Sequence, residues 1–156
     1  MKPPFFAFLG LSALLVFLVI SAPVLKDAGY VNASNLNYLM FSSACHQISE
    51  RSLHVFGAKM AVCARCFGIY AGMLIGCLLY PFLNRFERMP PGWVMLAAIA
   101  SLALDGVSQL FGLRESSNIL RVLTGLLFGG VIPYYLIPGF NLIYEDIKRL
   151  FISGCR

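Results

Sequence analysis

Four long apolar stretches dominate the sequence and limit what the chain can fold into. They cover about residues 5–25, 60–83, 93–113 and 118–137. A helix of roughly 20 apolar residues is long enough to cross the hydrocarbon core of a bilayer. The chain is 59% hydrophobic and 12% charged, whereas a soluble domain is about 45–50% apolar and about 25% charged. We therefore predict an all-α integral membrane four-helix bundle, in a single domain over residues 1–156, and exclude an ordinary soluble enzyme.

The segments between these spans are polar or contain helix breakers. Residues 27–37 are polar and turn-rich, and residues 36–56 form a short amphipathic segment between spans 1 and 2 that is too charged to cross. Pro90 and Pro91 separate the second and third spans, and we expect Pro138 to end the fourth. Residues 144–151 then resemble a short basic amphipathic tail on the membrane surface.

The first apolar stretch has two interpretations. Lys2 before an apolar run is typical of a secretory signal peptide. The run is too long for the apolar core of most signal peptides, and cleavage after Ala22 would leave Pro23 at the new terminus. We therefore interpret it as an uncleaved spanning helix.

Four spans place both termini on one side of the membrane. The distribution of Lys and Arg usually sets the orientation, but the 12 cations of this chain divide evenly between the two sides. We expect cytoplasmic termini, because the cations of the tail and of the turn at residues 84–88 form exposed groups. The cations at the opposite end then have roles other than orientation. The net charge of +5 is expected to meet the phosphates of the lipid bilayer rather than nucleic acid.

Ionisable and sulfur-bearing side chains are expected to gather at the end of the bundle away from the termini. Alternating spans bring the first connecting segment, the start of the second span, the end of the third and the start of the fourth to this end. Ionisable groups in spanning segments are costly and usually mark functional sites. The gathered residues are Cys45, His46, Glu50, Arg51, His54, Cys63, Arg65, Cys66, Asp105, Gln109, Arg114, Asn118 and Arg121.

Two thiols at the start of the second span indicate metal or redox chemistry. Cys63 and Cys66 lie three residues apart, and Arg65 and the helix N-terminus favour the thiolate form. With Cys45 and His46 they supply the ligand types that zinc or another divalent or soft metal prefers. The alternative is that these cysteines are only small residues in a helix interface.

The histidines leave more than one ligand set open. Adjacent residues such as Cys45 and His46 rarely both bind one ion, so His54 is a candidate in place of His46. If the segment is helical, His46, Glu50 and His54 would lie on one face as a further ligand set. A solvated amphipathic helix is the simpler interpretation of that face.

The polar residues of the third and fourth spans predict an anion pocket. Asp105 in the third span needs a partner, because an unpaired buried charge is costly, and we expect that partner to be Arg121. A structural pair that only fixes the helix register is the alternative. In the functional interpretation Asp105 and Gln109 are the catalytic residues. The residues expected to bind an anionic or lipid-phosphate substrate are Arg51, Arg114, Asn118 and Arg121.

Glycines repeat every four residues in two of the spans. Gly68, Gly72 and Gly76 lie along the second span, and Gly125 and Gly129 along the fourth. Small residues at this spacing allow the backbones of two membrane helices to approach closely. We therefore expect the second and fourth spans to be in contact.

These motifs together resemble one protein family. The residues that carry the resemblance are Cys45-His46-Gln47, Glu50-Arg51-Ser52, Cys63-x-Arg65-Cys66-x-Gly68-x-Tyr70-x-Gly72 and the polar pattern from Asp105-Gly106 to Thr124-Gly125. Over about residues 40–130 the chain resembles the domain-of-unknown-function family 2085, small prokaryotic membrane proteins. The resemblance implies a multi-pass protein of the prokaryotic cytoplasmic membrane and brings no activity.

Three classes of function remain open on this evidence. The first is a membrane metalloprotein, such as a metal-dependent enzyme acting on an anionic substrate. The second is a thiol–disulfide oxidoreductase that passes electrons from the Cys-x-x-Cys motif to a quinone. The third is a non-enzymatic assembly subunit or small-solute transporter. The sequence does not decide whether the protein is an enzyme.

Overall fold

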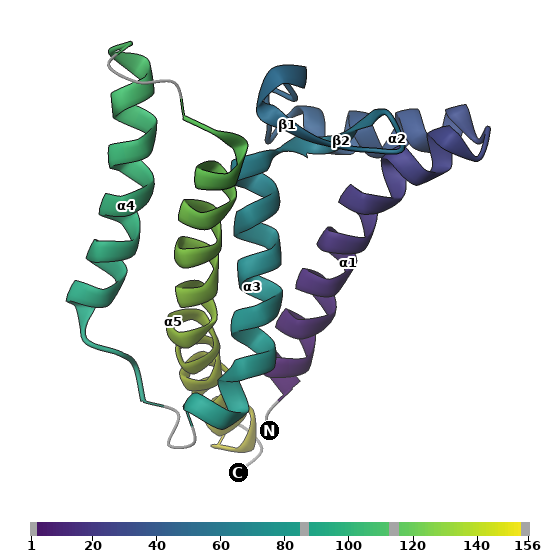
Figure 1. Ribbon diagram of the computed structural model, residues 1–156. Helices are drawn as coiled ribbons and strands as arrows, with labels where there is room; N and C mark the ends of the chain where they lie inside the picture. Colours follow the sequence, from purple (N-terminus) through teal and green to yellow (C-terminus); the bar gives the residue numbers. More distant parts are fainter. Residues whose placement is uncertain (1–2, 85–87, 113–115, 154–156) are drawn as a thin grey trace.

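The computed structural model describes residues 3–84, 88–112 and 116–153, and it confirms an all-α integral membrane bundle. Four helices are long and apolar enough to cross a membrane. They are α1 (Pro3–Asp27), α3 (Ala64–Leu83), α4 (Gly92–Leu110) and α5 (Asn118–Ser153). Figure 1 shows α1, α3, α4 and the first part of α5 running side by side, with both termini at one end and the connection between α1 and α3 at the other.

The tightest packing joins α3 to α5, as the glycine spacing predicts. A side-chain Cβ at Gly68 would lie 2.4 Å from the carbonyl oxygen of Val122, and one at Gly125 would lie 2.4 Å from that of Arg65. At Gly129 the distance to the carbonyl oxygen of Ile69 would be 2.1 Å. Real Cβ atoms do not approach backbone this closely, so only glycine permits the two helices to pack at this distance.

A β-hairpin replaces the predicted start of the second span. Strand β1 (Ser52–Val55) pairs antiparallel with β2 (Ala58–Cys63), so residues 60–63 are extended and α3 begins at Ala64. The loop is Phe56-Gly57, and both residues have positive φ, as a type I′ turn requires. The sequence interpretation was wrong here because residues 60–63 are apolar and Phe is an unusual residue at such a turn position.

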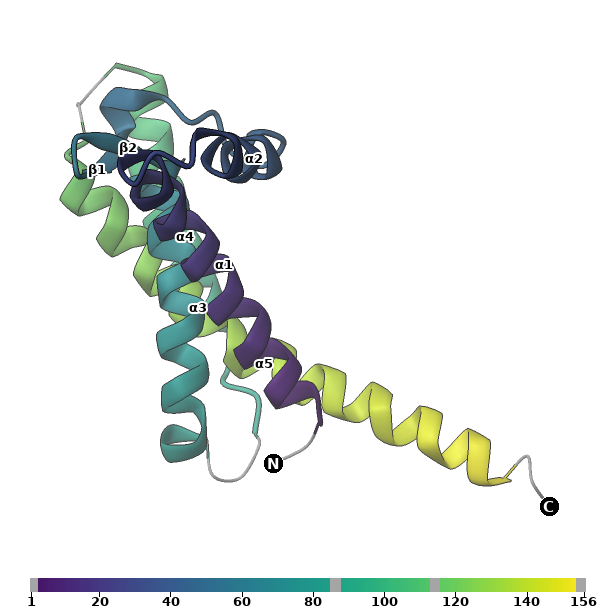
Figure 2. The same ribbon diagram turned by 90° about the vertical axis from the view of Figure 1, so that its right-hand side faces the viewer.

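Helix α2 (Val31–Ser42) lies across the end of the bundle, beside the hairpin (Figures 1 and 2). It begins where the sequence indicated a turn-rich linker, and two of its polar residues face α1. The hydroxyl of Ser34 donates to the carbonyl of Ala22 (2.7 Å), and the Asn37 amide donates to the Ser21 hydroxyl (2.9 Å). These bonds satisfy the two buried polar side chains of a segment that resembled a loop, while Asn32 and Asn35 are exposed. An apolar core then joins α1, α2 and β2, and it includes Val19, Phe41, Met60, Ala61 and Val62.

The fourth span does not end at residue 137, as Pro138 had suggested. Helix α5 continues through Pro133 and Pro138 to Ser153 and extends beyond the bundle in Figure 2. A proline removes one backbone hydrogen bond and bends a helix, but packing can keep the helix intact. Here Ile137 and Asn141 are buried. The third span is also shorter than expected, because α4 ends at Leu110 and residue 113 lies outside the described residues.

The close contact between α3 and α5 gives a first prediction. Replacing Gly129 with Ala should lower the free energy of unfolding by about 1–3 kcal/mol, because the new methyl group would overlap the backbone of Ile69. The measurement is SDS-induced unfolding in mixed micelles. Gly10→Ala in α1 is the matched control, since a Cβ there meets nothing within 4 Å. Equal effects of the two substitutions would contradict the close packing.

Candidate functional site

Three thiols converge at the end of the bundle that is opposite the termini. The sulfur atoms of Cys45, Cys63 and Cys66 all lie within 4.8 Å of one another. Cys63 is the last residue of β2 and the residue that caps α3, and Cys66 lies in the first turn of that helix. All three residues carry free thiols. Two of the predicted metal ligands are therefore close in sequence, and the third comes from the segment after α2.

The segment that carries Cys45 is fixed by hydrogen bonds to its neighbours. The Gln47 side chain donates to the carbonyl of Tyr38 (2.6 Å), and the ammonium group of Lys59 donates to the carbonyl of Gln47 (2.8 Å). The Tyr38 hydroxyl in turn donates to the carbonyl of Lys59. This ring of bonds joins α2, the segment and the hairpin, and so holds Cys45 next to the start of α3.

Hydrogen bonds also favour the thiolate form of Cys45. The backbone N–H of Cys63 donates to its sulfur over 3.1 Å. Hydrogen bonds from the Cys63 side chain first, and then from Cys66, lower the pKa of the Cys45 thiol far below its usual value, against the opposing effect of burial. Thiolates are the form of cysteine that binds metals and attacks disulfides.

A cavity of about 200 Å³ opens beside the three sulfurs. It lies between the segment after α2, the start of α3, the end of α4 and the start of α5. Its lining combines soft ligands with cationic side chains, and among the described residues no carboxylate lines it. The lining residues are Ala44, Cys45, His46, Ile48, Arg51, Cys63, Arg65, Cys66, Gln109 and Arg121.

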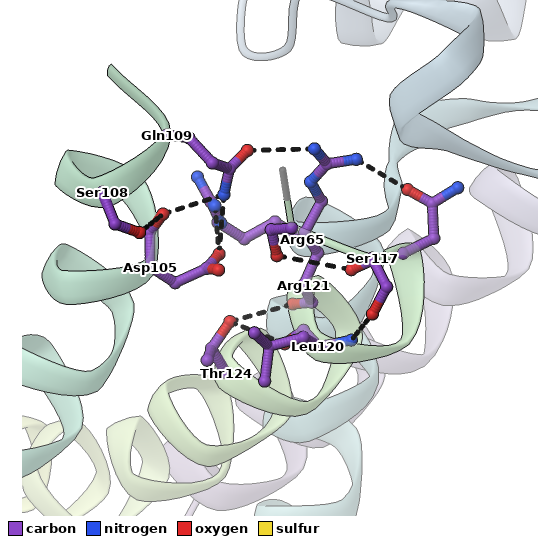
Figure 3. Close-up of polar contacts among 10 residues, drawn as sticks. Arg65, Asp105, Ser108, Gln109, Ser117, Leu120, Arg121 and Thr124 are labelled. Carbon is purple, nitrogen blue, oxygen red and sulfur yellow. Dashed lines mark hydrogen bonds and ion pairs between the residues drawn. The ribbon is translucent and has the colours of Figure 1, made fainter. Parts of the chain in front are cut away.

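Asp105 on α4 is paired with Arg65 and not with Arg121, so the predicted pair was wrong. The Arg65 guanidinium donates to Oδ2 of Asp105, and the Gln109 side chain donates to the same oxygen over 3.1 Å. Gln109 then accepts a hydrogen bond from Arg121 over 2.9 Å. Figure 3 shows Gln109 between the two charged groups. Gln109 lies one helical turn after Asp105 on α4. Its hydrogen bond holds the guanidinium of Arg121 at that position, away from the place that Arg65 takes beside Asp105.

Arg121 is buried in this network, and no described carboxylate pairs with it. It is 8% exposed, and its second hydrogen bond is to Asn118, whose side-chain oxygen accepts from it over 2.8 Å. The Asn118 amide donates to the carbonyl of Glu50 over 3.3 Å and thereby ties α5 to the hairpin side of the site. Among the described residues, both acceptors of the Arg121 guanidinium are therefore neutral amides.

The histidine face expected between residues 46 and 54 does not form. Residues 44–48 are largely irregular, Ser49–Arg51 form a single 3-10 turn, and His54 lies in β1. A stack of His46, Glu50 and His54 needs a continuous helix, which the pairing of β1 with β2 excludes. His54 lies 3.3 Å from the Ser49 hydroxyl, and His46 lines the cavity outside the group of three sulfurs.

The structure brings together most of the residues singled out from the sequence and gives one of them, Arg65, a different role. Arg51, Gln109 and Arg121 line the cavity, and Asn118 supports Arg121. Arg114 lies outside the described residues. Arg65 was expected only to favour the thiolates, yet it pairs with Asp105. The sequence could have indicated this pairing, because Arg65 lies inside the Cys-x-x-Cys motif, and that motif was expected at the same end of the bundle as Asp105.

The Arg65–Asp105 pair gives a second prediction. Asp105→Asn should lower the free energy of unfolding by about 3 kcal/mol, because it leaves a largely buried guanidinium without its counter-charge. The double variant Arg65→Gln/Asp105→Asn should lose less than the sum of the two single variants, since it removes both charges. SDS-induced unfolding of the four proteins measures this coupling. Additive losses would show that the pair does not stabilise the fold.

Two archaeal proteins are similar to this chain in sequence. An uncharacterized protein of Methanocaldococcus jannaschii is 46% identical over 114 residues, which cover 71% of this chain and 73% of that protein. An uncharacterized protein of Methanothermobacter thermautotrophicus is 39% identical over 90 residues, 56% of this chain and 79% of that protein. No solved structure matches the chain.

The family profile that matches covers the site and the helices that build it. Residues 45–135 match the family DUF2085, whose description is "predicted membrane protein". The match begins at Cys45 and includes α3, α4 and the first half of α5. The chain therefore belongs to the DUF2085 family of membrane proteins.

Proposed function

We propose that this membrane protein binds a metal ion through Cys45, Cys63 and Cys66, beside a cavity that admits an anionic ligand. The observation that carries the proposal is the convergence of three free thiols from two separate segments on one arginine-lined cavity. Packing alone does not require three cysteines at one point, because a cluster of small apolar residues would fill the same space.

The spacing of the sulfurs supports a soft metal. Tetrahedral zinc has Zn–S bonds of about 2.3 Å, which place its sulfur ligands about 3.8 Å apart. The three sulfurs, within 4.8 Å of one another, need only small rotations to reach that spacing. Thiolates select zinc and other soft metals over magnesium or calcium.

Three protein ligands would leave one tetrahedral position open. The cavity adjoins all three cysteines, so that position would face the cavity and not the packed interior. His46 also lines the cavity and is the candidate fourth ligand in a closed, structural site. A metal ion with an open position supplies Lewis-acid chemistry when it is bound.

The charges around the cavity support an anionic ligand. Arg51, Arg65 and Arg121 line it, and Asp105 pairs with only one of them. Asp105 and Gln109 orient the two buried guanidinium groups by hydrogen bonds. In an enzyme of this design Asp105 would be a positioning residue, since it acts through Arg65 and does not line the cavity, whereas Gln109 lines the cavity and would reach the ligand.

Thiol–disulfide exchange with a quinone is the second candidate function, because the three free thiols also lie close enough to pair after a small rotation. Two of them would form one disulfide, and their two electrons and two protons would convert the quinone to a quinol. Under this alternative, the thiols of the purified protein become unreactive to alkylation after quinone is added and reactive again after reduction.

The metal proposal predicts bound metal in the purified protein. Elemental analysis of detergent-purified protein should find about one equivalent of zinc or another soft metal per chain. Cys63→Ser and Cys66→Ser should each lower the metal content at least about tenfold, because serine does not replace a thiolate ligand.

Cys77→Ser is the matched control. Cys77 is a free, buried thiol of the same helix, but it packs near Tyr80 and Ile137, away from the cluster. This variant should keep its metal. Wild-type protein without metal, or equal metal in all three serine variants, would overturn the proposal.

A further inference from the structure

The cavity has a second set of binding groups that the three thiols do not use. Arg51, Arg65 and Arg121 line the same cavity as the sulfurs. These groups come from a 3-10 turn, from the first turn of α5 and from the first turn of α3. They supply hydrogen-bond donors to a ligand that carries acceptors.

Arg121 lines the cavity and has more N–H donors than its two amide partners accept. A guanidinium has five N–H groups in a planar fork, and the amides of Asn118 and Gln109 each take one. Burying an arginine at 8% exposure with only neutral acceptors is costly unless a further anionic acceptor is present. The cavity is the open space that Arg121 lines.

Arg65 provides a further donor that has no acceptor. Its Nη2 is paired with Asp105, but its Nε is buried and has no hydrogen-bond partner among the described residues. Buried N–H groups in folded proteins are almost always bonded, to protein, water or ligand. An acceptor in the cavity would satisfy this group.

Arg51 supplies a charge that is free to move toward a ligand. Its side chain is exposed and lines the mouth of the cavity, and no described residue forms an ion pair with it. Asp105 neutralises Arg65, and no other carboxylate among residues 3–84, 88–112 and 116–153 pairs with Arg51 or Arg121 at the cavity.

From these donors and charges we infer that the cavity binds a phosphate-type oxoanion, held by Arg51 and Arg121 with Arg65 Nε as a further donor. This inference deepens the proposed function and rests on it for the role of the neighbouring metal, but the anion contacts are made by arginines alone. Guanidinium forks match phosphate oxygens in pairs. A phosphate monoester carries about −1.5 to −2 charges, which matches the two uncompensated arginines. The positive N-terminal ends of α3 and α5 face the same space and favour an anion there.

The phosphate can be free or carried on a lipid, and the position of the site makes both sources accessible. Arg65 and Arg121 lie in the first turns of two spanning helices, which is the depth of lipid headgroups. Helix α4 packs along α5 and is otherwise largely exposed, with Leu104 and Leu110 on its surface. A lipid in the surrounding bilayer therefore lies next to this end of α4.

Isothermal titration of the purified full-length protein in neutral detergent tests the inference. One arm uses inorganic phosphate at constant ionic strength, with chloride as the reference anion. The other arms use short-chain phosphatidic acid and, as a counterpart whose zwitterionic headgroup has no net charge, short-chain phosphatidylcholine. Saturable binding of inorganic phosphate identifies a free anion as sufficient, and binding of phosphatidic acid alone identifies a lipid source. Either result supports the site.

Two variants locate the binding. Arg51→Gln should weaken the binding of the effective probe about tenfold, the effect of losing one charge-assisted hydrogen bond. The variant should still fold, because the Arg51 side chain is exposed. Lys148→Gln, near the far end of α5, removes the same charge and should bind as wild type. If neither probe binds, if phosphatidylcholine binds as well as phosphatidic acid, or if Arg51→Gln binds as tightly as Lys148→Gln, the inference is wrong.

Metal analysis of the same samples separates this inference from the proposed function. Metal content should be equal in wild type, Arg51→Gln and Lys148→Gln, because none of these changes touches a thiol. Phosphate binding by a protein that contains no metal would support the anion site and refute the metal centre. Bound metal without phosphate binding would support the metal centre and refute the anion site.

Discussion

The contact between α3 and α5 is the constraint on which the rest of the structure depends. Glycines on both helices let the two backbones touch, and no larger residue fits at Gly68, Gly125 or Gly129. Because the contact starts at the first turns of both helices, it places Arg65 beside the start of α5 and Arg121 beside the start of α3. The close approach of two backbones thus also builds the cationic wall of the cavity.

The polar network balances the cost of burying charge at this membrane end. Asp105 neutralises Arg65, while Gln109 accepts from Arg121 and donates to Asp105, so that α3, α4 and α5 are joined through side chains. Helix α4 has few buried residues of its own. Its position therefore depends on its packing against α5 and on these hydrogen bonds, in contrast to α3, which backbone contact fixes.

The first connecting segment completes the site from the other side. Helix α2 and the hairpin form a small apolar core with α1. Their hydrogen bonds hold Cys45 next to Cys63. No short-range sequence pattern would predict that these two residues lie side by side. Since β2 runs directly into α3, Cys63 stands at the junction of a strand and a helix. Cys45 thus comes from one separately stabilised part of the fold and Cys63 and Cys66 from another, and the two parts meet at one cavity.

The sequence by itself determined the class of protein, the alternation of the spans and the gathering of thiols, acid and guanidinium groups at one end, because these follow from hydrophobicity, length and parity. It also determined the contact of the glycine-bearing helices, because small residues at a four-residue spacing have few other uses. Only the tertiary structure decided that Arg65 and not Arg121 pairs with Asp105, that residues 58–63 form a strand, and that α5 continues past Pro138. These outcomes depend on which partner lies nearest across helices and on packing against distant residues, and no local pattern in the chain encodes those distances.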